Sequence, residues 1–249
     1  MHPRRFFVSK DDIRDGEVSL SGQDAVHISE SLRLDAGDNI IVLDGGGMEY
    51  DVLLSQVSRR LVCGKILASR ACESDVRAQI GLFHALPKGA EKVSFVLRRG
   101  TEIGVSEIGF FSSARSVPRI RQNERTEEKL DRWQRVVNEA AKQCRRTTVP
   151  KVGYFPDVAD VLDYCKTWDI ILIAWEGETK RLRDVLKGAE KANRIAVIIG
   201  PEGGFDEAEV RLAEQRGAKR FSLGHLILRS ELAGIVAASL ILYEFGDLG

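Results

Sequence analysis

The sequence has few of the residues that build metal centres or disulfide frameworks. Its 249 residues include four cysteines without a C-x-x-C pair and four well-separated histidines. Structural metal sites and disulfide scaffolds need such residues at short, regular spacings. The sequence therefore predicts no metal site and no disulfide framework, and it fits a reducing compartment.

Long hydrophobic runs are lacking as well. No apolar run approaches the ~20 residues that a membrane-spanning helix requires, and the first seven residues lack the apolar core of a signal peptide. We therefore expect a cytoplasmic protein with no membrane partner. The length of 249 residues allows one large domain or two modest ones.

The chain carries no excess charge of either sign, since 37 Lys and Arg balance 37 Asp and Glu. The charge is nevertheless uneven, because residues 112–151 hold eleven Lys and Arg against five Asp and Glu. A basic segment in a neutral chain suggests a polyanion at one surface. A solvated helix face explains the charge at least as well, so charge alone does not identify a partner.

The first 72 residues have the pattern of a small β-barrel-like module. One helix is expected over residues 21–32, and three glycines at 45–47 predict a hairpin turn. Residues 70–77 are interpreted as a linker. The expected strands are residues 5–8, 18–20, 39–43, 49–54 and 61–67.

After residue 77 strands and helices alternate, which is typical of a largely parallel sheet covered by helices. The periodicity predicts a helix over residues 127–146 with Trp133 in the core. The last helix, from Ser230 to about Phe245, has almost no polar face and must be buried in the core or in a subunit interface. The expected strands are residues 79–85, 107–111, 170–174, 194–199 and 220–223.

The most informative segment is the glycine-rich turn between the strand that ends at Ile199 and the helix that follows. Asp206 and Glu209 have the spacing of a capping box, and Phe205 and Val210 that of a hydrophobic staple. A strand edge, bare glycine backbone and a helix N-terminus together suit a nucleotide-like ligand.

The turn matches neither G-x-G-x-x-G nor G-x-x-x-x-G-K-[ST]. No lysine follows the glycines, and Glu202 places a negative charge inside the turn. This composition disfavours a polyphosphate and is compatible with a neutral or cationic ligand. A tight turn that binds no ligand explains the turn alone equally well.

Several separated segments together resemble one family, the bacterial small-subunit ribosomal RNA methyltransferases that make N3-methyluridine, which belong to the SPOUT class. The resemblance covers nearly the whole chain and rests on the order of its motifs. These are Arg5-Phe6-Phe7-Val8, Leu86-Pro87-Lys88-Gly89, Thr101-Glu102-Ile103-Gly104-Val105, Glu139-Ala140-Ala141-Lys142-Gln143-Cys144, Ile199-Gly200-Pro201-Glu202-Gly203-Gly204 and Ile227-Leu228-Arg229.

The resemblance implies an α/β fold in which a PUA-like β-barrel, residues 1–72, precedes a SPOUT domain, residues 73–249, with a trefoil knot formed by about residues 195–235. It implies S-adenosylmethionine as cofactor and a homodimer formed through the C-terminal domain. The implied substrate is a uridine of 16S ribosomal RNA near the decoding centre, methylated in the assembled small subunit.

The resemblance also implies roles for individual residues. Arg229 is the candidate to stabilise negative charge on the uracil oxygens, and Glu231 orients Arg229 or acts on the N3 proton. A structural ion pair between these two residues is the alternative. The expected cofactor-binding residues are Ile199, Gly200, Glu202, Gly203, Gly204, Leu223, Gly224, Ile227, Leu228 and Ser230.

Contacts to RNA phosphates are expected from basic residues of both modules, namely Arg4, Arg5, Lys88, Arg99, Arg115, Arg119, Lys142, Arg145 and Arg146. The chain departs from the family pattern at Ala114, Arg145, Leu226 and Leu232. Two other functions therefore remain open: a SPOUT methyltransferase with a different target nucleotide, and a non-catalytic RNA-binding assembly factor.

Overall fold

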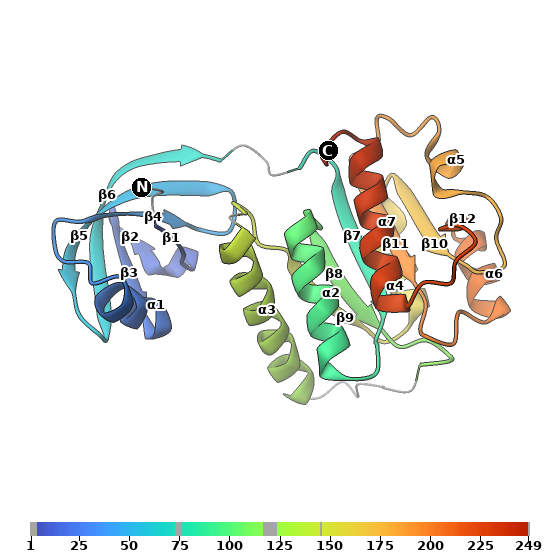
Figure 1. The fold of residues 1–249 in the computed structure, drawn as a ribbon, viewed down its shortest axis with the longest axis horizontal. Coiled ribbons are helices and arrows are strands. Elements are labelled where there is room, and N and C mark those ends of the chain that lie inside the picture. The colour runs from blue at the N-terminus through green and yellow to red at the C-terminus, as the bar shows by residue number, and fades with distance from the viewer. Residues whose placement is uncertain (1–3, 73–75, 117–123, 145, 249) are drawn as a thin grey trace. The chain divides into compact units, whose positions relative to one another are not determined.

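The computed structural model describes residues 4–72, 76–116, 124–144 and 146–248. Contacts within the chain divide it into two compact units, drawn together in Figure 1. The first unit comprises Met1–Asp75 together with Ala141–Val149, and the second comprises Val76–Ala140 and Pro150–Gly249. Nothing in the sequence pattern indicated that residues 141–149 return to the first unit.

The first unit is built on a six-stranded sheet with the order β1-β4-β5-β6-β3-β2. Strands β1 and β4 are parallel, and every other neighbouring pair is antiparallel. Gly45 and Gly47 have positive φ angles in the connection from β4 to β5, so the predicted hairpin turn is confirmed. The strands are β1 (Arg5–Phe7), β2 (Ile13–Arg14), β3 (Glu17–Ser21), β4 (Asn39–Leu43), β5 (Met48–Val57) and β6 (Leu61–Ala71).

Two local expectations for this unit need correction. The expected helix at residues 21–32 is a short α-helix, α1 (Gly22–Val26), followed by one π-helical turn over His27–Ser31. Strand β6 extends through Ala71, which pairs with Met48, so the first residues of the expected linker are strand. The polar composition of this strand end hid its pairing from the sequence pattern.

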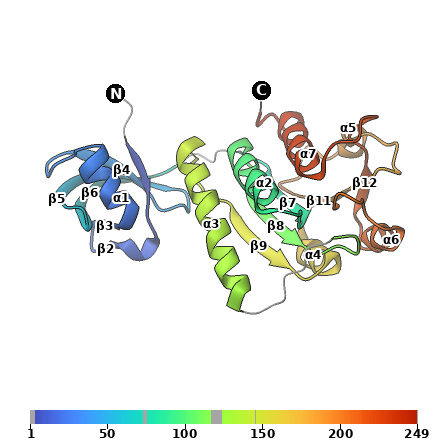
Figure 2. The ribbon, with the colours of Figure 1, turned by 60° about the horizontal axis from the view of Figure 1, so that its bottom comes forward.

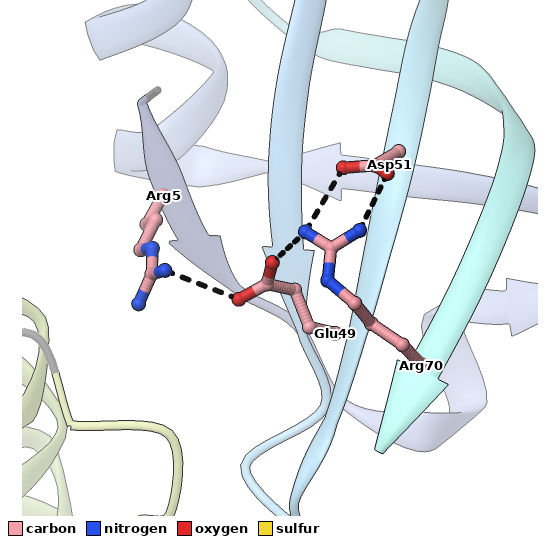
Figure 3. Close-up of polar contacts among 4 residues, drawn as sticks. All are labelled: Arg5, Glu49, Asp51 and Arg70. Carbon is pink, nitrogen blue, oxygen red and sulfur yellow. Dashed lines mark hydrogen bonds and ion pairs between the residues drawn. The ribbon is translucent and has the colours of Figure 1, made fainter. Parts of the chain in front are cut away.

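Glu49 on β5 is the buried centre of an ion-pair cluster, shown in Figure 3. Its side chain accepts a hydrogen bond from Arg70 on β6 and lies 3.3 Å from the guanidinium of Arg5 on β1. Arg70 also pairs with Asp51 at 2.7 Å. Arg5, an expected phosphate contact, is thus already paired with a carboxylate inside its own unit.

We predict that Glu49→Ala lowers the free energy of unfolding by about 1–3 kcal/mol, because it leaves two guanidinium groups without their shared buried acceptor. Urea unfolding followed by circular dichroism measures the change. Glu17→Ala is the control, since Glu17 is an exposed residue on β3 of the same sheet. Equal stability of the two variants would contradict the structural role of the cluster.

The second unit contains a six-stranded sheet in which all neighbouring strands are parallel, in the order β12-β10-β11-β7-β8-β9. The expected strands at residues 79–85, 107–111, 170–174 and 194–199 have the observed bounds, whereas β9 was not expected. The strands are β7 (Gln79–Ala85), β8 (Glu107–Phe111), β9 (Lys151–Phe155), β10 (Ile170–Ala174), β11 (Arg194–Ile199) and β12 (Lys219–Phe221).

Helices cover both faces of this sheet, as Figure 2 shows. Helices α2 and α7 pack on each other and on one face, and α4 and α6 contribute to the core on the other. Trp133 of α3 contacts Phe110 with ring centroids 4.8 Å apart, so its predicted core position is confirmed. The helices are α2 (Ala90–Ile103), α3 (Glu124–Cys144), α4 (Val158–Tyr164), α5 (Leu182–Leu186), α6 (Glu207–Gln215) and α7 (Ser230–Glu244).

Helix α7 lies unusually close to the sheet. A Cβ atom at Gly234 would come within 3.0 Å of the Leu82 side chain on β7 and 3.5 Å of Ile199 on β11. The opposite side of the helix is not covered in the single chain, because Leu232, Leu240 and Tyr243 are 40%, 43% and 65% exposed. The core alone therefore does not bury this helix all round, and a subunit interface is the remaining expectation.

Candidate functional site

The candidate site lies at the carboxyl edge of the parallel sheet. Strand β11 ends at Ile199 and leads through the glycine turn into α6, while β12 ends at Phe221 and leads into α7. Because the strands are parallel, these two connections leave the sheet at the same edge, which is where open α/β sheets bind ligands. The expected cofactor-binding residues belong to the ends of these strands or to these connections, except Ser230, which is the first residue of α7.

The glycine turn is held in one conformation by hydrogen bonds. The Gly204 amide donates to the Pro201 carbonyl at 2.9 Å, and Gly204 has a φ of 68°, which favours glycine. The predicted capping box is confirmed: the Glu209 amide donates to Asp206 at 2.7 Å, and the Asp206 amide donates to Glu209 at 3.1 Å. The backbone of the turn is thus preorganised.

The glycine turn is also tied to the loop after β8. Glu209 accepts hydrogen bonds from the Ser113 hydroxyl at 3.1 Å and from the Ala114 amide at 3.0 Å. Arg115 donates to the Gly203 carbonyl at 3.0 Å. Arg115, an expected phosphate contact, therefore lies directly beside the expected cofactor loop.

The second connection runs alongside the segment before α5. The Ser222 amide donates to the Lys180 carbonyl at 2.8 Å, and the Leu182 amide donates to the Ser222 carbonyl at 3.3 Å. Beyond this point the loop projects outward, since Leu226 is 81% and Ile227 90% exposed. The apolar side chain of Ile227 is therefore available to a flat apolar ligand, and its contact with adenine stays a prediction.

The two expected catalytic residues sit at the start of α7 in different environments. The carbonyl of Arg229 accepts the first helical hydrogen bonds while its side chain is exposed. Glu231 is only 8% exposed and accepts a hydrogen bond from the Ser230 hydroxyl at 3.4 Å. Among the described residues no ion pair joins Arg229 to Glu231, so the structural ion-pair alternative is not observed.

Lys92, in the first turn of α2, belongs to the site but was not predicted from the sequence. Its ammonium group donates to Glu202 of the glycine turn and lies 3.9 Å from Glu231 of α7. The Glu202 hydrogen bond raises the pKa of Lys92, and the charges of both carboxylates act in the same direction. Lys92 is thus a cation that links the two connections, a role that its place on a polar helix start does not signal.

His84 near the end of β7 was missed too, because an apolar strand conceals a single polar residue. The ring is fully buried, and Nδ1 donates to the Ala85 carbonyl at 2.5 Å. Within the described part of the chain Nε2 has no hydrogen-bond partner. Burial lowers the pKa of His84, although the Ala85 carbonyl and the charges of Glu231 and Glu202 oppose this effect.

The expected phosphate contacts occupy varied environments. Lys88 is exposed, Arg4 is partly exposed, and Arg99 pairs with Glu102 on α2. Lys142 pairs with Asp24 at 2.9 Å, and Arg146 is buried at 6% exposure with a hydrogen bond to Thr148, so these two lie within their unit. Arg119 and Arg145 fall outside the described residues.

The described residues include no group of three or more His, Cys, Asp and Glu side chains arranged to hold a metal ion. In the same part of the chain, no helix has both the length and the apolar character needed to cross a membrane.

We predict that the stability of the protein falls with acidity because of His84. Below about pH 6.5 the unfolded chain binds a proton on this histidine, whereas the folded protein, in which burial lowers the His84 pKa, binds that proton only at a lower pH. The free energy of unfolding therefore falls by up to about 1.4 kcal/mol per pH unit as pH drops through this window. His84→Gln removes this contribution, so the stability difference between variant and wild type changes between about pH 7 and 5. Urea unfolding at each pH measures the free energy of unfolding of both proteins. A difference between them that does not change with pH would contradict the prediction.

The chain is similar in sequence to RNA methyltransferases. A family model described as an RNA methyltransferase domain matches residues 74–242. The ribosomal RNA small subunit methyltransferase E of Bacillus subtilis is 30% identical, with 97% of this chain and 96% of that protein covered. The protein of the same name from Synechocystis is 29% identical over 95% of this chain and 76% of its own length.

Two solved structures of methyltransferases match nearly the whole chain. A ribosomal RNA small subunit methyltransferase E from Neisseria gonorrhoeae, bound to S-adenosyl methionine, matches with a TM-score of 0.83 and 26% identity over 98% of both chains. A putative methyltransferase from Legionella pneumophila, in complex with the bound cofactor SAM, matches with a TM-score of 0.85 and 25% identity over 98% of both chains.

Proposed function

Because the chain belongs to the ribosomal RNA small subunit methyltransferase E family, we propose that it methylates N3 of a uridine in 16S ribosomal RNA near the decoding centre, within the assembled small subunit. S-adenosylmethionine is the methyl donor of this family, as bound in two similar structures. The observation that supports the reaction best is the convergence of the glycine turn, Arg229 and buried Glu231 at one sheet edge. We propose a cytoplasmic location, because the proposed substrate is ribosomal.

The residues of the two connections fit this cofactor. The backbone groups of Ile199, Gly200 and Gly224 are suited to the polar edges of adenine, and exposed Ile227 to its apolar face. The negative charge of Glu202 is already paired with Lys92, so the fit to the cofactor rests on the backbone and apolar contacts of the two connections. The remaining expected contacts are Gly203, Gly204, Leu223, Leu228 and Ser230.

S-adenosylmethionine supplies an electrophilic methyl group on a sulfonium. Uridine N3 must lose its proton to become a nucleophile, and we assign that proton to the carboxylate of Glu231. The N3 electron pair then forms the bond to the methyl carbon while the carbon–sulfur bond breaks. Arg229 and the N-terminus of the 15-residue helix α7 stabilise the negative charge that develops on the uracil oxygens.

We predict that Arg229→Ala slows methyl transfer by about 100-fold or more, because a fixed cation beside a developing charge acts mainly on the transition state. Affinity for S-adenosylmethionine should stay within a few-fold of wild type, as measured by isothermal titration calorimetry. Wild-type turnover in this variant would remove Arg229 from the mechanism.

The decisive test of the whole proposal uses labelled S-adenosylmethionine and small ribosomal subunits from a strain that lacks the gene. Nucleoside chromatography of the product should show label in N3-methyluridine. Label in another nucleoside would keep the enzyme class and move the target. Binding of RNA without binding of the cofactor would favour the assembly-factor alternative.

We further propose a homodimer formed through the C-terminal domain. Leu232, Leu240 and Tyr243 leave an apolar stripe along α7 uncovered, and exposed Leu226 and Ile227 lie at the same end of the chain. An uncovered apolar stripe of this kind is typical of a subunit interface.

We predict that Leu240→Glu converts the dimer to a monomer, because it places a charge within this stripe. Light scattering coupled to gel filtration measures the mass. Leu67→Glu is the matched control, since Leu67 is an exposed leucine on β6 of the first unit. The same mass for both variants would argue against an α7 interface.

The domain organisation is part of the proposal. We assign the first unit to a PUA-like β-barrel and the second to a SPOUT domain, with a trefoil knot formed by about residues 195–235. The backbone of Ser222 is hydrogen-bonded to Lys180 and to Leu182, so the connection from β12 to α7 passes beside the earlier loop before α5. This passage supports the proposed knot.

The RNA contacts are also part of the proposal. The phosphate contacts that the described side chains best support are exposed Lys88, Arg99 and Arg115, together with Arg4 from the first unit.

A further inference from the structure

Three elements of the second unit converge on the carboxylate of Glu231. Lys92 approaches it from α2, His84 from β7, and Glu202 from the glycine turn, while Arg229 and Ser230 directly precede it on the chain. The Glu231 side chain is only 11% exposed. A buried carboxylate is costly to ionise unless a cation compensates its charge.

Of these neighbours, Lys92 is the cation held against Glu231. Burial lowers the pKa of His84 and keeps the ring neutral, and Glu202 has the same sign of charge as Glu231. Arg229 is exposed and forms no ion pair with Glu231 among the described residues. Lys92 lies 3.9 Å from Glu231 and is anchored by its hydrogen bond to Glu202.

We propose that Lys92 is a positioning residue that ties the glycine turn to the start of α7 and keeps a positive charge beside Glu231. The inference rests on the proposed function, since it assumes that Glu231 accepts the N3 proton. A carboxyl group can accept a proton only when it is charged. The charged form is disfavoured once the neighbouring cation is removed. Lys92 thereby favours the charged form in which Glu231 can accept the N3 proton.

The test compares Lys92→Met with wild type in single-turnover methyl transfer to small subunits over a range of pH. The ratio of the two rates cancels the ionisation of uridine, which is common to both enzymes. We expect the variant to be about tenfold slower near pH 6 and within about threefold of wild type near pH 8.5. A ratio that does not change with pH overturns the proposal, because a merely structural defect slows the reaction equally throughout.

Two control variants accompany this measurement. Lys92→Arg retains the cation and should stay within about threefold of wild type at every pH. Arg98→Met removes one positive charge from an exposed position on the same helix and should follow the wild-type profile. Calorimetric titration of Lys92→Met with S-adenosylmethionine should give an affinity within about threefold of wild type, which separates folding and cofactor binding from the pH effect.

A double-variant comparison separates this inference from the proposed function. If Glu231→Gln has the wild-type rate, the assignment of Glu231 as base fails. If Glu231→Gln is slow, Lys92→Met introduced into it should produce no additional pH dependence, because the group on which Lys92 acts is gone. A pH-dependent loss that persists in the double variant overturns the role of Lys92.

Discussion

The close packing of α7 on the parallel sheet is the constraint on which the candidate site depends. Gly234 allows the helix to approach so closely that a Cβ atom at this position would lie 3.0 Å from the Leu82 side chain, tighter than ordinary packing. This approach brings the first turn of α7, with Ser230 and Glu231, down beside His84 at the end of β7. A helix held farther from the sheet would leave Glu231 in solvent, where Lys92 would have little influence on its charge.

The regular parts of the second unit could be predicted from the sequence because their strands are continuous apolar runs with clear ends. Strand β9 was missed because its residues are only partly buried and it lies at the sheet edge, so it lacks that run. The return of residues 141–149 to the first unit depends on contacts between distant segments, such as Lys142 with Asp24, which no local pattern encodes.

The candidate site was predictable where backbone chemistry defines it and obscure where buried side chains do. Glycine spacing and the capping pair of Asp206 and Glu209 indicated the turn correctly. Lys92 and His84 escaped notice because each is a single polar residue in an ordinary helix start or strand, and only the fold brings them to Glu231. Arg5 and Lys142 are paired with carboxylates inside the first unit and Arg146 is buried, which the charge count along the sequence did not indicate. Their contacts with RNA stay predictions.

The described site draws on residues from across the length of the second unit, from His84 to Glu231. Strand β7 lies near the start of this unit, and α7 ends five residues before the last residue of the chain. During synthesis, β7, α2 and the glycine turn therefore emerge before the helix that supplies Arg229 and Glu231. The site is therefore completed last, when α7 packs onto a sheet edge whose strand β7, helix α2 and glycine turn come earlier along the chain.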